Sequence, residues 1–210
     1  MSVFYRFQDS GLDDWNKANN FVQMGFRPGF AVQARELTQM QTIMQAQITA
    51  LARRFLKSGS LLDSSVLLTP GQGIWQAQLT SGYFYIEPYE KDLGYFVYNP
   101  ETIVLSNIDA TQGRVNVYIQ WEEVQVNPDG EEFPPLNGFA KVKVDETLKD
   151  NAQGYANYSA PGASRYQINI VNAGFYLDDG TQDLPANAAI VFYIEDGIPK
   201  YNDTNDPISY

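Results

Sequence analysis

The chain has 210 residues, 19% of them charged, and its formal net charge is −11 at pH 7. It is long enough to bury a sizeable core, and its composition is that of a folded protein. The acidic balance argues against nucleic acid as a partner, because phosphate binding requires clustered Lys and Arg. The sequence contains neither cysteine nor histidine, which excludes disulfides, Cys/His zinc sites and histidine-based catalysis. We therefore expect no metal and no cofactor. No membrane partner is expected either, since no apolar window approaches the roughly 20 residues that span a bilayer.

The first 60 residues combine an aromatic lead-in with one long helix. Residues 1–30 alternate aromatic and polar residues and close with a turn signal at Arg27, Pro28 and Gly29. The helix is expected to begin near Ala31 and to end near Leu56, with Gly59 as its C-terminal cap. A small basic cluster is expected in its last turn, where cations suit the helix dipole, at Arg53, Arg54 and Lys57.

An apolar stripe runs along this predicted helix. Its six members follow spacings of 3, 4, 4, 3 and 4 residues, so three of them recur eleven residues later: Leu37, Met40, Met44, Ile48, Leu51 and Phe55. They fall within an arc of roughly 80°, which is narrower than the face of an ordinary core helix. An eleven-residue period predicts nearly straight or slightly right-handed packing against a partner helix.

Glutamines, not charged residues, border the stripe. Gln41 and Gln47 lie on its two sides, and almost no charge occurs between Glu36 and Arg53. A border amide can be half-buried and hydrogen-bonded without the desolvation cost of a charge. We therefore expect the helix to be enclosed by copies of itself or by a neighbouring protein. The alternative is a helix packed in the core of a monomer, with an uncharged polar face.

From residue 61 onward the pattern has a period of two, which is typical of strands. Six segments are rich in β-branched and aromatic residues and are bounded by Gly, Pro, Asn or Asp: 82–89, 94–106, 113–126, 139–146, 165–177 and 188–197. The repeated turn signals favour antiparallel pairing. The sequence thus predicts a mainly β, α+β fold. A helical assembly segment (1–60), bundled with other copies, precedes an antiparallel β-sandwich or small barrel (61–210).

No constellation of residues favours catalysis. Three acidic pairs are candidates for glycosidase carboxylates. The first lies on a strand, where neighbours point to opposite faces, and the others have the composition of hairpin turns: Glu122/Glu123, Asp178/Asp179 and Glu195/Asp196. The clustered oxygens of residues 202–206 lack the features of a calcium loop. Exposed aromatics remain candidates for stacking on sugars: Trp75, Tyr83, Tyr85, Tyr89, Tyr95 and Tyr98. We expect no enzyme.

Two stretches carry a resemblance to a known family. NFVQMGFRPGFAVQARELTQMQTIMQAQI (20–48) resembles the N-terminal signature of a family of tailed-bacteriophage virion proteins, found especially in cyanophages and other contractile-tailed phages. LKDNAQGYANYSAPGASRYQI (148–168) is similar to a second segment of that family. The resemblance implies a structural component of the tail, located in the baseplate or at the attachment point of the tail fibres. It implies a virion protein made in the host cytoplasm.

The resemblance also implies partners and structural roles. The expected partners are other copies of the chain, three being the expected number, and other baseplate or tail-fibre proteins. Because the 210 residues lack the repetitive shaft of larger members, an adaptor role is favoured over host recognition. Arg35 and Glu36 are expected to fix the start of the helix, and Arg165 to brace the turn at Pro161 and Gly162. The alternative function is a carbohydrate-binding β-module that recognises host surface glycans.

Overall fold

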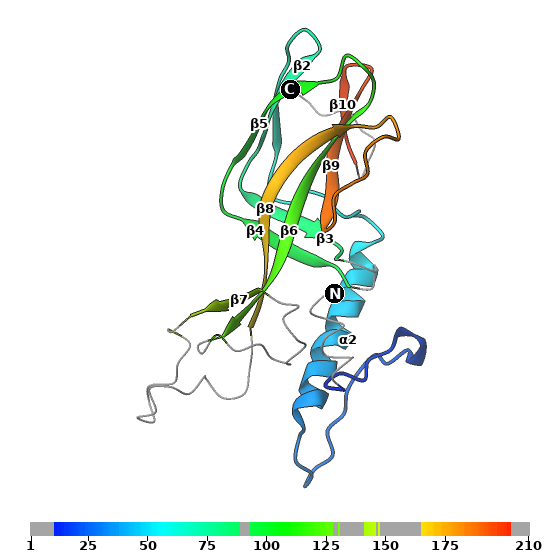
Figure 1. Cartoon of the computed structure of the whole chain (residues 1–210). Helices are drawn as coiled ribbons and strands as arrows, with labels where there is room; N and C mark the ends of the chain where they lie inside the picture. The colour runs from blue at the N-terminus through cyan, green and yellow to red at the C-terminus, as the bar shows by residue number, and fades with distance from the viewer. Residues whose placement is uncertain are drawn as a thin grey trace. The chain divides into compact units, whose positions relative to one another are not determined.

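The computed structural model describes residues 11–88, 93–127, 130, 141–145, 147 and 165–202 (Figure 1). The chain divides into two compact units, each built from two segments. The first unit comprises Met1–Gln47 and Glu123–Ile168, and the second comprises Ile48–Glu122 and Asn169–Tyr210. Three elements run from one unit into the other: α2 (Ala34–Ala52), β6 (Val115–Asn127) and β8 (Arg165–Leu177).

The first unit holds the lead-in segment, most of α2 and the end of β6. The short 3-10 helix η1 (Lys17–Asn19) begins where the side chain of Asn16 accepts a hydrogen bond from the amide of Ala18. β7 (Lys141–Val144) pairs in parallel with the end of β6, from Val124 opposite Lys141 onward. Gln125 is completely buried there and donates its amide to the hydroxyl of Tyr166 at 3.0 Å.

Helix α2 begins at a capping interaction. The carboxylate of Glu36 accepts a hydrogen bond from the backbone amide of Gln33 at 2.8 Å, and this satisfies a donor that the helix itself cannot. The side chain of Arg35 lies 3.5 Å from the carboxylate of Asp14, with both groups exposed. Glu36 therefore caps the start of the helix, and Arg35 adds an exposed ion pair beside it.

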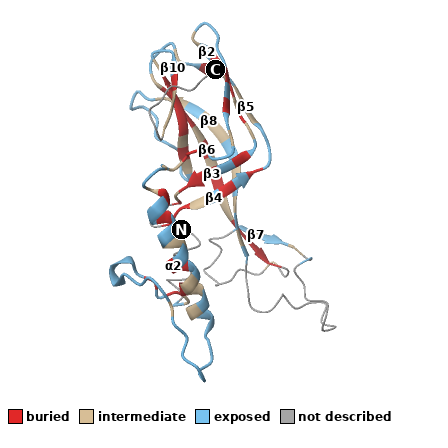
Figure 2. Ribbon diagram, turned by 180° about the vertical axis from the view of Figure 1, so that it is seen from behind, coloured by how far each residue is buried: buried red, intermediate tan, exposed pale blue. Residues whose placement is uncertain are grey.

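The second unit consists of short β-sheets. The first has the order β1–β2–β5, and a second is a pair formed by β3 and β4; their bounds are β1 (Val66–Thr69), β2 (Ile74–Leu79), β3 (Gly82–Ile86), β4 (Tyr95–Asn99) and β5 (Ile103–Asp109). β6 joins β9 (Ala188–Glu195) and β10 (Ile198–Tyr201) in the order β10–β9–β6–β7, and β8 also pairs with β6. The buried residues, red in Figure 2, lie mainly on β2, β3, β6 and β9.

Burial along β6 follows the predicted alternation on one face only. Val115, Val117, Ile119 and Trp121 are all buried, as their spacing predicts. Asn116 on the opposite face is also buried, and the three residues that follow it on that face are half-buried. That face is therefore only partly solvated.

Gly59 has a different role from the predicted helix cap. Its φ is +100°, and a Cβ at this position would overlap the backbone carbonyl of Ile190 in the same unit. Only glycine allows both this backbone conformation and this close approach. The segment is also anchored to β3, since the amide of Gly59 donates to the carbonyl of Tyr85 at 2.8 Å and the amide of Tyr85 donates to the carbonyl of Ser60.

The predicted fold class is wrong. The part of the chain that the structure describes contains one α-helix of 19 residues, not a long bundle helix, and its strands form three sheets, not a sandwich or barrel. The helix starts three residues later than predicted because Glu36 caps Gln33. It ends at Ala52 because Arg54 and Phe55 bond three residues back, which tightens the chain. Its last turn consequently holds no basic residue. Local turn signals did not reveal the parallel pairing of β6 with β7.

Several predicted strands are confirmed. The segment 165–177 coincides with β8. Four other segments overlap strands with different bounds: 113–126 with β6, 139–146 with β7, 82–89 with β3 and 188–197 with β9. The segment 94–106 contains two strands, β4 and β5. Three short strands were not predicted: β1, β2 and β10.

Candidate functional site: an apolar ridge on α2

The face of α2 that is buried within the chain is largely polar. Gln39, Thr42 and Thr49 are all buried on it, and the only buried residues of the helix beside them are Ile43 and Ala52. In the first unit, the hydroxyl of Thr42 donates to the carboxylate of Asp13 at 2.5 Å. The inner face is therefore held by specific hydrogen bonds, more than by apolar packing.

The same pattern continues in the second unit. The hydroxyl of Thr49 accepts a hydrogen bond from the amide of Gly94 at 2.8 Å. Just beyond the helix, Arg53 forms a bidentate ion pair with Glu87, with N–O distances of 3.0 and 3.2 Å. Tyr85 donates its hydroxyl to the same carboxylate. Burial and this carboxylate together raise the pKa of the Tyr85 hydroxyl far above its ordinary value.

The predicted stripe lies on the opposite, open side of α2, except for Phe55, which follows three residues after the helix ends. We call its six residues the apolar ridge: Leu37, Met40, Met44, Ile48, Leu51 and Phe55. Met40 is half-buried, and the other five are exposed, from 45% for Leu37 to 74% for Phe55. Within one chain this helix therefore has its apolar side outward and its polar side inward, the reverse of an ordinary amphipathic helix.

The border glutamines are exposed as well. Gln41 lies in solvent, and Gln47 donates its amide to the carbonyl of Val22 at 2.9 Å, which ties the lead-in segment to α2 in the first unit. No charged residue occurs from Leu37 to Ala52. The ridge and both of its borders are thus free of charge over 16 residues, in a chain with a net charge of −11.

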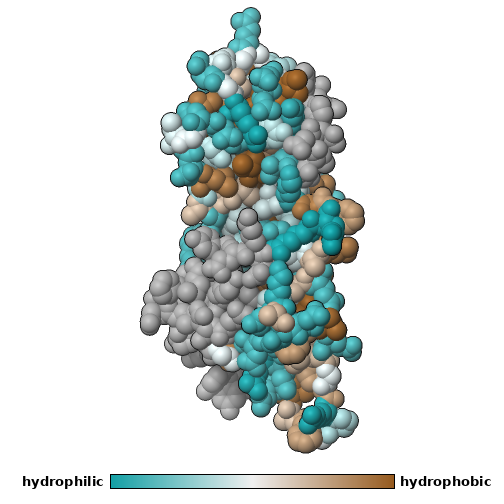
Figure 3. Space-filling view, turned by 90° about the vertical axis from the view of Figure 1, so that its right-hand side faces the viewer, coloured by the Kyte–Doolittle hydropathy of each residue, from teal (hydrophilic) through white to brown (hydrophobic). Residues whose placement is uncertain are grey.

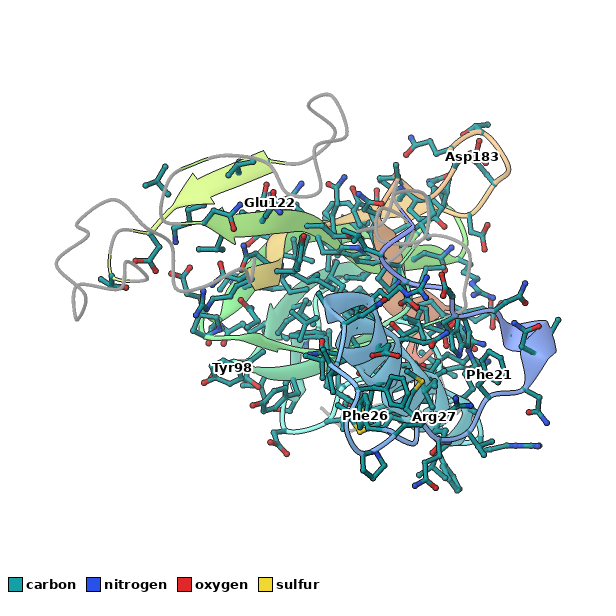
Figure 4. All side chains as sticks on the ribbon, turned by 90° about the horizontal axis from the view of Figure 1, so that it is seen from below. Phe21, Phe26, Arg27, Tyr98, Glu122 and Asp183 are labelled. Carbon is teal, nitrogen blue, oxygen red and sulfur yellow. The ribbon has the colours of Figure 1, made fainter. Side chains whose placement is uncertain are left out.

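The lead-in segment adds further exposed apolar side chains beside α2 in the first unit. Five of them are between 44% and 73% exposed: Phe21, Val22, Phe26, Phe30 and Val32. Figure 4 shows Phe21, Phe26 and Arg27 on one side of the start of α2. Figure 3 shows brown apolar patches, interrupted by teal, on the side of the molecule that it turns to the viewer. Isolated exposed apolar residues are ordinary, but a group of this size is typical of an interaction surface.

The remaining predicted motif residues that the structure describes lie in a turn before α2 and at the start of β8. Arg27, Pro28 and Gly29 form a turn, in which the amide of Phe30 donates to the carbonyl of Arg27 and Gly29 has a φ of +82°. Arg165 is the exposed first residue of β8, and its charge helps to lower the pKa of Asp145. Pro161 and Gly162 lie outside the described residues.

Several acidic residues of the described chain serve turns and surface ion pairs. Asp178 lies 3.4 Å from Arg114, and Glu195 lies 3.2 Å from Lys200. Three aspartates accept hydrogen bonds from the amide and the hydroxyl of the threonine two residues on, which lowers the pKa of each carboxyl: Asp109, Asp145 and Asp179. No group of three or more acidic residues able to hold a metal ion occurs among the described residues.

Two of the aromatics considered for sugar binding are unsuited to it. Trp75 and Tyr85 are buried. Tyr83 and Tyr98, on β3 and β4, are 41% and 55% exposed, and their ring centroids lie 5.1 Å apart. Tyr89 lies outside the described residues.

Two contacts at the site were missed by sequence reasoning: Asp13 with Thr42, and Arg53 with Glu87. Their partners lie 29 and 34 residues apart. The only available signal was the polarity of the helix face opposite the ridge, where threonines recur at positions 42 and 49.

Comparison with known proteins identifies the family. The model of one protein family, described as a domain of unknown function (DUF4815), matches residues 10–205. The chain belongs to this family. No curated protein and no solved structure matches it. Among the described residues, no helix is long and apolar enough to cross a membrane.

Proposed function

We propose that the chain is a structural, non-enzymatic protein of a bacteriophage tail. It acts as a baseplate component or as an adaptor that attaches tail fibres, and it works by stable association with other proteins. The identity of the assembly is supported by the resemblance of residues 20–48 and 148–168 to virion proteins of tailed phages. Its partners are other copies of the chain and neighbouring baseplate or fibre proteins.

One observation carries the association mechanism: the apolar ridge is exposed while the polar face of the same helix is buried. Burial of apolar surface yields about 25 cal/mol per Å². The apolar surface of the ridge is not buried in the folded chain, so this free energy is released only when another protein covers the ridge. The contacts of Thr42, Thr49 and Arg53 hold α2 in this orientation. The ridge is therefore the surface through which the protein joins its assembly.

The test is the composition of the mature particle. Particles of the phage that encodes this chain are purified by density gradient and analysed by quantitative mass spectrometry, with antibody-gold labelling in electron micrographs. The proposal predicts a fixed number of copies per particle and label confined to the tail. A protein abundant in the infected cell but absent from purified particles would rule the proposal out.

A second candidate function is sugar binding by the second unit. It rests on Tyr83 and Tyr98, two exposed neighbouring rings that could stack on a hexose. A glycan array tests it, with Tyr98→Ala as the disrupting variant. Phe96→Ala is the control, because Phe96 is the neighbouring exposed aromatic on β4 and its ring lies beside Tyr85 instead. Binding that Tyr98→Ala abolishes and Phe96→Ala retains would favour this function.

A further inference from the structure

We propose that the apolar ridge of α2 packs against the same ridge of a second copy of this chain. This inference rests on the proposed function, because it names the partner of the surface proposed there. It makes the contact symmetric, with like residues meeting like residues.

The first argument is the pattern of charge. A symmetric contact brings identical side chains close together, so a charged residue near its centre meets a like charge and repels it. The ridge and its borders are uncharged from Leu37 to Ala52, although the chain as a whole carries −11. A different partner would impose no such restriction, since it could present the opposite charge. The neutrality of this helix is therefore what contact between two acidic copies requires.

The second argument is the chemistry of the border. An amide both donates and accepts hydrogen bonds, so a glutamine can pair with an identical glutamine, whereas two carboxylates or two ammonium groups cannot. Gln41 borders the ridge and lies in solvent. In a symmetric contact it can satisfy its polar atoms on the equivalent residue or on the backbone of the second copy.

The third argument is area. A stable interface buries about 800 Å² on each partner. Five exposed ridge residues and five exposed lead-in residues are each roughly half accessible, and each such side chain offers on the order of 80 Å². The ridge alone falls short of a stable interface, while the ridge together with the lead-in segment reaches it. We therefore assign the five exposed lead-in residues to the same contact.

Reversal of charge at Met44 tests this inference. Met44 lies near the middle of the ridge and is 51% exposed, so it meets or neighbours its counterpart whether the two helices run parallel or antiparallel. The full chain, Met44→Glu and Met44→Lys are compared by light scattering at tens of micromolar. The full chain should associate, and each charged variant should self-associate at least about tenfold more weakly. An equimolar mixture of the two variants should recover association, because opposite charges then face each other.

Two controls separate charge from other effects. Met44→Gln adds polarity without charge and should retain more association than either charged variant. Gln112→Glu adds the same charge at an exposed residue of the loop between β5 and β6 and should behave as the unaltered chain. Circular dichroism checks that every variant is folded.

Three results would overturn the inference: a monomeric full chain, undiminished association of both charged variants, or a mixture that recovers nothing. None of these results bears on whether the protein is present in the particle. A monomer that is nevertheless a component of the tail would leave the proposed function in place, with a different protein on the ridge.

Discussion

The sheets of the second unit and the helix α2 are held in place by different forces. Phe84, Ile108 and Phe192 are fully buried on their strands, so those strands are stabilised by removal of apolar surface from water. Most apolar residues of helix α2 are exposed, and the helix is held in place by hydrogen bonds of its threonine hydroxyls with the carboxylate of Asp13 and the amide of Gly94. The comparison teaches that the apolar side of a helix does not always indicate the interior of its own chain.

This difference has a physical consequence. Apolar burial is non-directional and tolerates small displacements, whereas a hydrogen bond fixes its partners to within a few tenths of an ångström. The hydrogen bonds of Thr42 and Thr49 therefore set the orientation of α2, while the ridge stays exposed for contact with a partner. The two regions should respond very differently to the same substitutions.

The largest contrast is expected between two phenylalanines. Phe84→Ala removes a completely buried ring from β3 and should lower the free energy of unfolding by about 3–5 kcal/mol. Phe55→Ala removes a ring that is 74% exposed and should change the unfolding free energy of the monomer by less than about 0.5 kcal/mol. Urea denaturation at concentrations where the chain is monomeric measures both.

Phe55→Ala should nevertheless weaken self-association, because that ring is part of the ridge. Similar losses of monomer stability for the two variants would contradict the comparison. They would mean that Phe55 is packed within its own chain.

A smaller contrast is expected on the inner face of α2. Thr49→Val keeps the shape of the side chain and removes the hydroxyl that accepts a hydrogen bond from the amide of Gly94. Loss of a buried acceptor of this kind should cost about 1–3 kcal/mol. Thr38→Val is the matched control, since its hydroxyl only donates to the carbonyl of Ala34, one turn back in the same helix. We expect that control to change stability by less than about 0.5 kcal/mol.

Thermal and urea unfolding of the two threonine variants provide the measurement. Equal effects at positions 38 and 49 would show that α2 is not fastened through the hydroxyl of Thr49. The comparison between polar fastening and apolar burial would then fail for the second unit.

The sequence predicted the strands better than their arrangement. The segment 165–177 matched β8 because β-branched and aromatic residues between Gly and Asp signals are a local property. The sandwich or barrel was wrong, because the pairing of β6 with β7, β8 and β9 joins residues distant in the chain. The long helix was wrong at both ends: Glu36 caps Gln33 at the start, and Arg54 and Phe55 bond three residues back at the end.

The ridge was predictable because a helix has a fixed period. Leu37, Met44, Ile48 and Leu51 fall on one side of α2 as their spacing requires. Phe55 is exposed too, three residues beyond the end of the helix. Which side faces the chain was not predictable from that pattern alone. It depends on Asp13 and Gly94, the hydrogen-bond partners of Thr42 and Thr49, and no sequence signal connects these residues to the helix.

The smallest expected effect is a pH dependence of stability. It arises at Asp13, whose carboxylate accepts the hydrogen bond from Thr42 of α2 in the first unit. Burial raises the pKa of the Asp13 carboxyl above the ordinary value of 3.8 and is the largest cause of the shift. The hydrogen bonds with Thr42 and Trp15 lower this pKa in part, and the nearby charge of Asp14 raises it further. A raised folded-state pKa means that the folded chain holds this proton more tightly than the unfolded chain. The resulting contribution to stability is fully present below pH 3.8 and is lost as the pH rises through the raised value.

Asp13→Asn removes this titration and keeps one oxygen as an acceptor for Thr42 or Trp15. Relative to the unaltered chain, the variant should therefore gain stability as the pH rises from about 3.8 toward neutrality. The difference between the two chains is the quantity to measure, by urea unfolding across this range. Other carboxyls with a shifted pKa, such as the lowered ones of Asp109 and Asp179, alter the stability of both chains by the same amount and cancel in this difference. A constant difference would mean that the hydrogen bonds from Thr42 and Trp15 offset the burial of the Asp13 carboxylate completely. The charged form of this contact would then carry no net penalty, and the contrast with the apolar sheets would be smaller than the structure indicates.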